Sequence, residues 1–115
     1  MNIKIYHNPR CSKSRQTLEL LRSKNIEPEI IEYLAEPPGL AELEILFNLL
    51  NIDSAVEMMR TKEPEFKEAG LTKESGNEAL LAEITQFPKL LERPIVVTDK
   101  GARICRPPEL VEELL

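Results

Sequence analysis

Residues 7–15 read His-Asn-Pro-Arg-Cys-Ser-Lys-Ser-Arg, and they join a short apolar run at residues 3–6 to a long amphipathic stretch at residues 12–25. The apolar run alternates like a strand that has one covered face. Asn-Pro then supplies the chemistry of a turn. In the amphipathic stretch Leu18 and Leu21 share one helical stripe. This part of the chain therefore predicts a strand, a tight turn and a helix that begins at Cys11.

The remaining pattern predicts an α/β protein. The segment at residues 29–34 is β-branched at its centre, as strands often are, and it completes a parallel βαβ unit. A helical insertion over about residues 39–92 follows, and its last helix, expected over residues 75–91, is interrupted or ended by Pro88. Two antiparallel strands at residues 93–98 and 102–105 are joined by Asp-Lys-Gly, which predicts a hairpin turn. A closing helix at residues 109–115 completes the order. We expect a single domain over residues 1–115 with a four-stranded mixed sheet and the thioredoxin-like order of elements.

Composition narrows the classes of function. The net charge of −5 over 115 residues argues against binding nucleic acid. Neither a signal peptide nor a membrane span is expected, which favours the cytoplasm. The two cysteines, Cys11 and Cys105, are expected to be free thiols in that reducing compartment. The two cysteines lie far apart in sequence, without the spacing of metal ligands, and the single histidine could not complete a zinc site with them. No metal is therefore expected.

Cys11 is the candidate nucleophile. The unpaired N–H groups of a helix that starts beside it would stabilise its thiolate, and they could also hold an oxyanion against the sulfur. Arg10, Lys13 and Arg15 form a locally positive loop with no acid before Glu19. The hydroxyl groups of Ser12 and Ser14 could donate hydrogen bonds to the anion. The alternatives are a buried structural cysteine and a solvated basic turn.

Other candidates lie at the ends of the predicted strands. His7 could act as a base or could support the thiolate, with support favoured because no carboxylate partner is visible. Arg93 precedes Pro94, which could take the cis form and face the cysteine. Arg106 precedes a pair of prolines, and guanidinium groups suit tetrahedral oxyanions. Cys105 is expected to be buried, and a resolving role is disfavoured because no C-x-x-C spacing supports it.

The loop at residues 7–15, with the Gln-Thr-Leu-Glu that follows it, resembles the glutaredoxin-dependent arsenate reductase family of thioredoxin-like fold. Arg-Pro-Ile-Val-Val at residues 93–97 and Cys-Arg-Pro at residues 105–107 agree with the resemblance, which covers nearly the whole chain. It implies that the Cys11 thiolate attacks arsenate and that glutathione and glutaredoxin resolve the adduct. It further implies that His7 and Ser14 help to lower the pKa of the cysteine. The oxyanion-binding arginines that it implies are Arg60, Arg93 and Arg106.

Two other functions remain open at this point. The fold also resembles regulators of the Spx type, which bind RNA polymerase and sense oxidation through C-x-x-C. In this chain Ser14 stands where the second cysteine of that switch would be. A generic glutathione-dependent thiol oxidoreductase without arsenate activity is the third possibility. For the arsenate reductase we expect a monomer without a bound cofactor, in which glutathione is a co-substrate.

Overall fold

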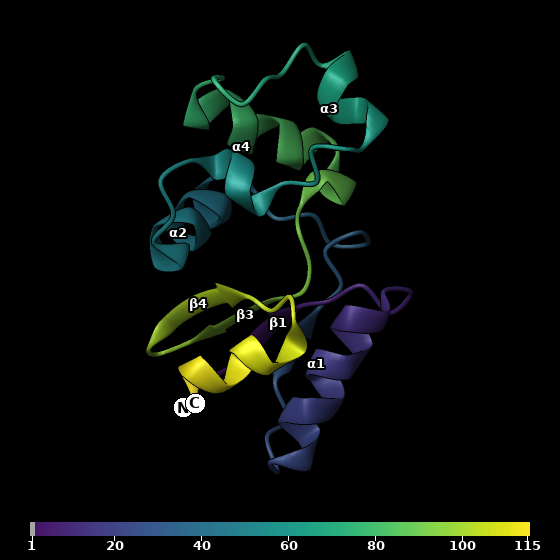
Figure 1. The fold of residues 1–115 in the computed structure, drawn as a ribbon, viewed down its shortest axis with the longest axis vertical. Helices are drawn as coiled ribbons and strands as arrows, with labels where there is room; N and C mark the ends of the chain where they lie inside the picture. Colours follow the sequence, from purple (N-terminus) through teal and green to yellow (C-terminus); the bar gives the residue numbers. More distant parts are fainter. Residues whose placement is uncertain (1) are drawn as a thin grey trace. The chain divides into compact units, whose positions relative to one another are not determined.

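The computed structural model describes residues 2–115, which divide into two compact units. One unit comprises the chain up to Glu36 together with Arg93–Leu115, and the other is Pro37–Glu92. The first unit contains a four-stranded sheet in the order β2-β1-β3-β4 (Figure 1). Its strands are β1 (Lys4–Tyr6), β2 (Glu29–Ile31), β3 (Ile95–Thr98) and β4 (Gly101–Ile104). β1 pairs parallel with β2 and antiparallel with β3, and β3 pairs antiparallel with β4. The predicted mixed sheet and thioredoxin-like fold are confirmed.

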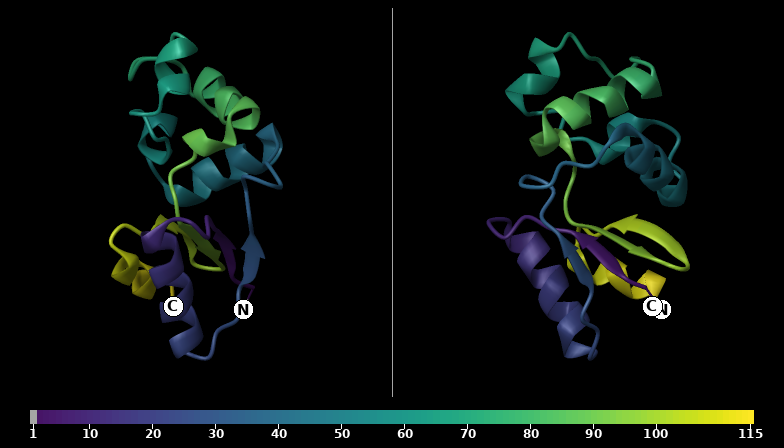
Figure 2. Two further views of the ribbon diagram at one scale, coloured as in Figure 1. Left: turned by 90° about the vertical axis from the view of Figure 1, so that its right-hand side faces the viewer. Right: turned by 180° about the vertical axis from the view of Figure 1, so that it is seen from behind.

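Two helical elements, α1 (Ser12–Ser23) and η3 (Pro108–Leu114), pack together against the sheet of the first unit (Figure 2). The apolar stripe of α1 explains this packing, because Leu18 and Leu21 are buried there among Ile5, Val96 and Val111. Burying such side chains supplies the main driving force for the unit. The packing fixes α1 on the sheet, and with it the cysteine loop that precedes the helix.

Most predicted elements differ from the structure by one or two residues at an end: β1 begins at Lys4, α1 ends at Ser23, β3 begins at Ile95 and β4 is Gly101–Ile104. Three elements differ more. The second strand ends at Ile31 rather than residue 34, because the chain turns there and the N–H groups of Ala35 and Glu36 both bond the carbonyl of Glu32. The closing helix is a 3-10 helix that begins at Pro108. The helix expected over residues 75–91 is α4 (Asn77–Gln86), followed by a separate 3-10 turn, η2 (Pro88–Leu90). Pro88 ends α4 because its ring cannot continue the helix.

The second unit is helical. Besides α4 and η2 it contains α2 (Leu40–Leu50), η1 (Ala55–Met58) and α3 (Pro64–Glu68). Ser54 begins η1 with a capping box, in which the Ser54 N–H donates to Glu57 Oε2 at 3.1 Å. Pro64 opens α3 at the position where its missing N–H costs nothing. None of the helices within residues 2–115 has the length and the apolar character needed to cross a membrane.

Candidate active site

Cys11 is the residue at which the chain enters α1. It has an extended backbone (φ −93°, ψ 123°), and its carbonyl accepts the first helical hydrogen bond, from the N–H of Arg15 at 3.0 Å. Its own N–H donates to the carbonyl of Asn8 at 2.9 Å, and the Asn8 side chain accepts from the N–H of Arg10 at 3.0 Å. Asn8 therefore shapes the turn twice, which places the thiol at the N-terminus of the helix.

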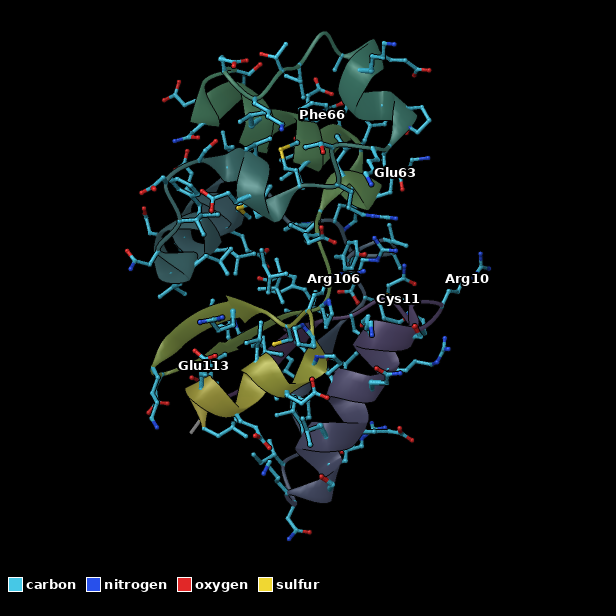
Figure 3. The ribbon with its side chains drawn as sticks, in the orientation of Figure 1. Arg10, Cys11, Glu63, Phe66, Arg106 and Glu113 are labelled. Atoms are coloured by element: carbon cyan, nitrogen blue, oxygen red, sulfur yellow. The ribbon has the colours of Figure 1, made fainter. Side chains whose placement is uncertain are left out.

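The thiol lies in a site that favours its ionised form. Burial opposes ionisation, since the residue is only 9% exposed. The backbone N–H groups of Ser14 and Lys13 and the guanidinium of Arg93 outweigh this effect, so the pKa of Cys11 is lower than that of an ordinary cysteine. Arg106 adds a second guanidinium, with its Nη1 at 3.9 Å from the sulfur (Figure 3). This is the environment of a reactive thiolate.

The sheet register explains why these residues meet. Tyr6 on β1 pairs with Ile95 on β3, and Ile95 pairs with Ile104 on β4. Because the two hairpin strands are antiparallel, Arg93 and Arg106 leave the sheet at the same end, just beyond this row. The row also ends β1, so the cysteine loop begins there. The peptide bonds before Pro94 and Pro107 are both cis, and Arg106 Nη1 donates to the Arg93 carbonyl at 3.1 Å.

His7 acts on the loop through Ser14. Its Nδ1 lies 2.6 Å from the Ser14 hydroxyl oxygen, and that oxygen accepts a hydrogen bond from the N–H of Asn8 at 3.0 Å. Burial lowers the pKa of His7, so the imidazole is neutral at pH 7. A neutral ring can accept the serine proton at Nδ1. The structure thus brings together His7, Ser14 and the loop backbone, while the role of His7 as support or as base stays a prediction.

We expect Ser14→Ala to lower the free energy of unfolding by about 1–3 kcal/mol, because the change leaves the buried ring of His7 and the half-buried N–H of Asn8 without their hydrogen-bond partner. Ser14 contributes its backbone N–H to the sulfur, which alanine keeps, so the pKa of Cys11 should change little. Urea unfolding and the pH dependence of alkylation of Cys11 measure the two effects. A large rise in the pKa of Cys11 in a folded variant would instead assign the effect to the hydroxyl group.

The arginines of the loop, Arg10 and Arg15, do not lower the pKa of the Cys11 thiol as Arg93 does. Arg10 is exposed and points away from Cys11 in Figure 3. Arg15 is exposed and donates from Nη1 to the carbonyl of Pro9 at 2.9 Å, so it holds the loop. Ser12 is the exposed first residue of α1. The positive charge that lowers the pKa of the Cys11 thiol comes from Arg93, which is distant from Cys11 in the sequence.

Arg60 lies in the second unit. Its backbone N–H donates to the carbonyl of Leu90 at 2.7 Å, and its guanidinium pairs with Glu63 at 2.8 Å. Lys89 approaches Glu63 at 3.9 Å and pairs with Glu65 at 2.7 Å. Arg60 is therefore held both by its backbone and by a network of acids. Only the family resemblance pointed to this residue, because an arginine in the helical insertion carries no local signal. The short helix expected to run through Arg60 is η1, which ends at Met58, so Arg60 lies just beyond it.

Cys105 belongs to the core of the first unit. Its side chain is fully buried, its thiol lies 3.6 Å from the carbonyl of Arg103, and burial raises its pKa to about 12. A thiol in this state is a poor nucleophile at neutral pH. Within residues 2–115 no group of three or more histidine, cysteine or acidic residues could hold a metal ion.

The raised pKa of Cys105 predicts a pH-dependent stability. A group whose pKa is higher in the folded state stabilises the fold below its unfolded pKa, and this contribution is lost as the pH rises toward the folded pKa. For Cys105 that window runs from about pH 9 to about pH 12. The difference in unfolding free energy between wild type and Cys105→Ala should therefore narrow across this window. A constant difference would contradict the assignment.

Asn8 and Pro9 are site residues that the sequence analysis treated only as a turn. The backbone N–H and C=O of Asn8 and its side chain are all bonded within the loop, and Pro9 receives the Arg15 hydrogen bond. The Asn-Pro pair was the available signal. It predicted that the chain turns, but not that the turn is held from both sides.

Comparison with known proteins agrees with this geometry. The model of the ArsC family matches residues 6–114. The chain belongs to the ArsC family. It is 51% identical over 114 residues to the uncharacterized protein YfgD of Escherichia coli K12, covering 98% of this chain and 96% of that protein. It is 49% identical over 114 residues to an arsenate reductase of Neisseria meningitidis serogroup A, covering 98% and 97%.

Solved structures of this family have the same fold. The structure of arsenate reductase from Vibrio cholerae superposes with a TM-score of 0.95 at 46% sequence identity, covering 100% of this chain and 98% of that one. The structure of a putative arsenate reductase from Yersinia pestis superposes with a TM-score of 0.90 at the same identity, covering 97% and 99%. Membership of the ArsC family and the cysteine site together indicate an oxidoreductase.

Proposed function

We propose that this ArsC-family protein reduces arsenate to arsenite, with Cys11 as the nucleophile and glutathione and glutaredoxin as the reductants. The observation that carries the proposal is the Cys11 thiol itself, whose pKa is lowered at the N-terminus of α1 beside Arg93 and Arg106. Helix N-termini and guanidinium groups are the groups that bind tetrahedral oxyanions in proteins. A nucleophile and an anion-binding site therefore coincide, and relatives of this chain bear the name arsenate reductase.

In the proposed reaction the Cys11 thiolate attacks the arsenic of arsenate, and one oxygen leaves as water to give a Cys11–S–As(V) adduct. The thiol of glutathione replaces a second oxygen, which also leaves as water. The glutaredoxin thiolate then attacks the glutathione sulfur. The bond between the glutathione sulfur and arsenic breaks with its electron pair on arsenic, giving As(III) and a glutathione–glutaredoxin disulfide. Water finally releases arsenite and regenerates the Cys11 thiolate.

The protein's contributions to this sequence are electrostatic. Arg93 and Arg106 would neutralise the charge of arsenate and orient it for attack, while the N–H groups of the first turn stabilise the thiolate before and after the reaction. Arg60 would supply a third guanidinium, as the family resemblance implies. Cys105 takes no part, because its buried thiol is not ionised at neutral pH. Both reducing thiols therefore come from other molecules.

A coupled assay tests this function. We expect oxidation of NADPH that requires arsenate, glutathione, glutaredoxin and glutathione reductase together, and that fails when any one is omitted. Thioredoxin with its reductase should not replace the glutathione system. Absence of arsenate-dependent oxidation with well-folded protein would refute the proposal. Reduction of glutathione mixed disulfides without any arsenate activity would favour the generic thiol oxidoreductase instead.

A further inference from the structure

A hollow of about 430 Å³ lies along the side of α1 and is here called the α1 groove. At one end it is lined by Pro9 and Ser12, which flank Cys11 closely in sequence, and by His7. Arg15 and Leu18 also line it and follow Cys11 by four and seven residues, so they lie on the side of α1 that begins at the cysteine. The groove therefore starts beside the thiol loop and runs along the helix.

The groove has the size and the lining of a binding site for a small polar molecule. Its volume falls within the range of ligand pockets, which is roughly 300–1,000 Å³. Leu18 is buried and gives the groove an apolar side chain. The hydrogen bond of Arg15 to the Pro9 carbonyl fixes one guanidinium nitrogen at 2.9 Å, while a guanidinium carries five N–H donors in all. Arg15 can therefore hold the loop and still bind a carboxylate.

Acidic and amide groups continue the groove along α1. Glu19 lies one turn beyond Arg15, and Gln16 lies between them in sequence. Both side chains are exposed. A ligand along this wall would meet a guanidinium, then an amide, then a carboxylate. The Arg22 guanidinium lines the groove beyond Glu19, and its charge is paired with Glu27 at 2.9 Å. The order from Arg15 to Glu19 complements a molecule with a carboxylate, peptide groups and an ammonium group.

We propose that the α1 groove binds a small zwitterionic peptide thiol of the glutathione class, with a carboxylate at Arg15, an ammonium group at Glu19 and the thiol directed toward Cys11. This inference rests on the proposed function, which requires a thiol from outside the chain. Cys11 lies at the N-terminal end of α1 (Figure 3), next to Ser12 and close to Pro9, which line the groove. Arsenate would bind to the guanidinium groups of Arg93 and Arg106, so arsenate and the peptide thiol would use different side chains.

The probe for this site is S-methylglutathione, which cannot form a disulfide or reduce arsenic. Titrated into the full-length, isotope-labelled protein, it should shift the backbone amide signals of Ser12, Arg15, Gln16 and Glu19 in a saturable manner. Arg15→Ala should weaken binding by roughly tenfold, which corresponds to the loss of one charge-assisted hydrogen bond. Lys24→Ala is the matched control, because it removes a cation of similar exposure next to the same helix but outside the groove, and it should leave the affinity unchanged.

A second pair of measurements keeps the test independent of the loop. Glu19→Gln lies on an exposed position of the helix and should weaken binding of S-methylglutathione. It should not weaken binding of the N-acetylated probe, which has no ammonium group. Equal weakening by Arg15→Ala and Lys24→Ala would show general attraction of anions and would overturn the inference. Signal changes confined to other parts of the protein, or no saturable change, would also overturn it.

Failure of the groove and failure of the proposed function are distinguishable. If S-methylglutathione does not bind in the groove while glutathione-dependent arsenate reduction is intact, the inference is wrong and the function stands. If it binds there and arsenate is not reduced, the groove stands and the proposed function is wrong.

Discussion

Cys11→Ser is expected to lower arsenate reduction by at least about a thousandfold, the largest effect of any single substitution. The serine hydroxyl has nearly the same size but is not ionised at neutral pH, so the backbone N–H groups and Arg93 that stabilise a thiolate have no nucleophile to act on. The coupled NADPH assay measures the loss. Circular dichroism and thermal unfolding should show that the variant is folded.

Cys105→Ser is the matched control for this experiment, since it changes the other thiol by the same atom. It should retain turnover at neutral pH, although replacing a buried sulfur by a hydroxyl group will cost stability. Substantial arsenate reduction by Cys11→Ser would contradict the assignment of the nucleophile. Loss of turnover in folded Cys105→Ser would show that the second thiol takes part after all.

The second large effect is expected at the two arginines of the sheet end. Arg93→Ala and Arg106→Ala should each raise the KM for arsenate by about ten- to a hundredfold, since each removes hydrogen bonds to a charged group. Arg93→Ala should also raise the pKa of Cys11, because its charge and hydrogen bond lower that pKa in the wild type. The midpoint of the pH profile for iodoacetamide alkylation should therefore move to higher pH.

The control for these variants is Arg103→Ala. Arg103 lies on β4, and its guanidinium pairs with Glu113 at 2.8 Å on the surface. Exposed pairs of this kind contribute little to stability. Arg103→Ala should therefore change neither the KM for arsenate nor the alkylation profile. If Arg93→Ala leaves the KM for arsenate and the alkylation profile as in the wild type, the proposed role of Arg93 is wrong. If Arg106→Ala leaves KM and kcat unchanged, the proposed role of Arg106 is wrong.

The sequence alone predicted the parts of the molecule that local rules govern. Asn-Pro before Cys11 predicted the turn, and the helix begins at Ser12, one residue after the predicted start at Cys11, which is its N-cap. The hairpin turn between β3 and β4 was also predicted correctly from Asp-Lys-Gly. In each case the deciding residues lie within a few positions of the feature, so no knowledge of the tertiary packing was needed.

Features that depend on distant residues were harder to predict. The loop cations Arg10 and Arg15 looked like the source of the field at Cys11, but Arg93, far away in sequence, is the cation that lowers its pKa. Sequence proximity cannot show which way a long side chain points. The closing segment has apolar spacing that short α and 3-10 helices share, so the pattern could not distinguish the two. The hydrogen bonds of Asn8 within the loop likewise depend on the path of the backbone, which the sequence does not show.

The row of paired residues Tyr6, Ile95 and Ile104 has a consequence for where this chain can accept added sequence. The turn at residues 99–100 lies at the other end of the β3–β4 hairpin, beyond the pair Thr98–Gly101, which is three residue pairs from that row. At about 3.3 Å per residue this amounts to roughly 10 Å of strand. An epitope or reporter peptide inserted in the turn would keep every cross-strand pair, whereas one extra residue inside β4 would carry Cys105 to the opposite face of the sheet. The turn is therefore the natural attachment point for a label on an active protein.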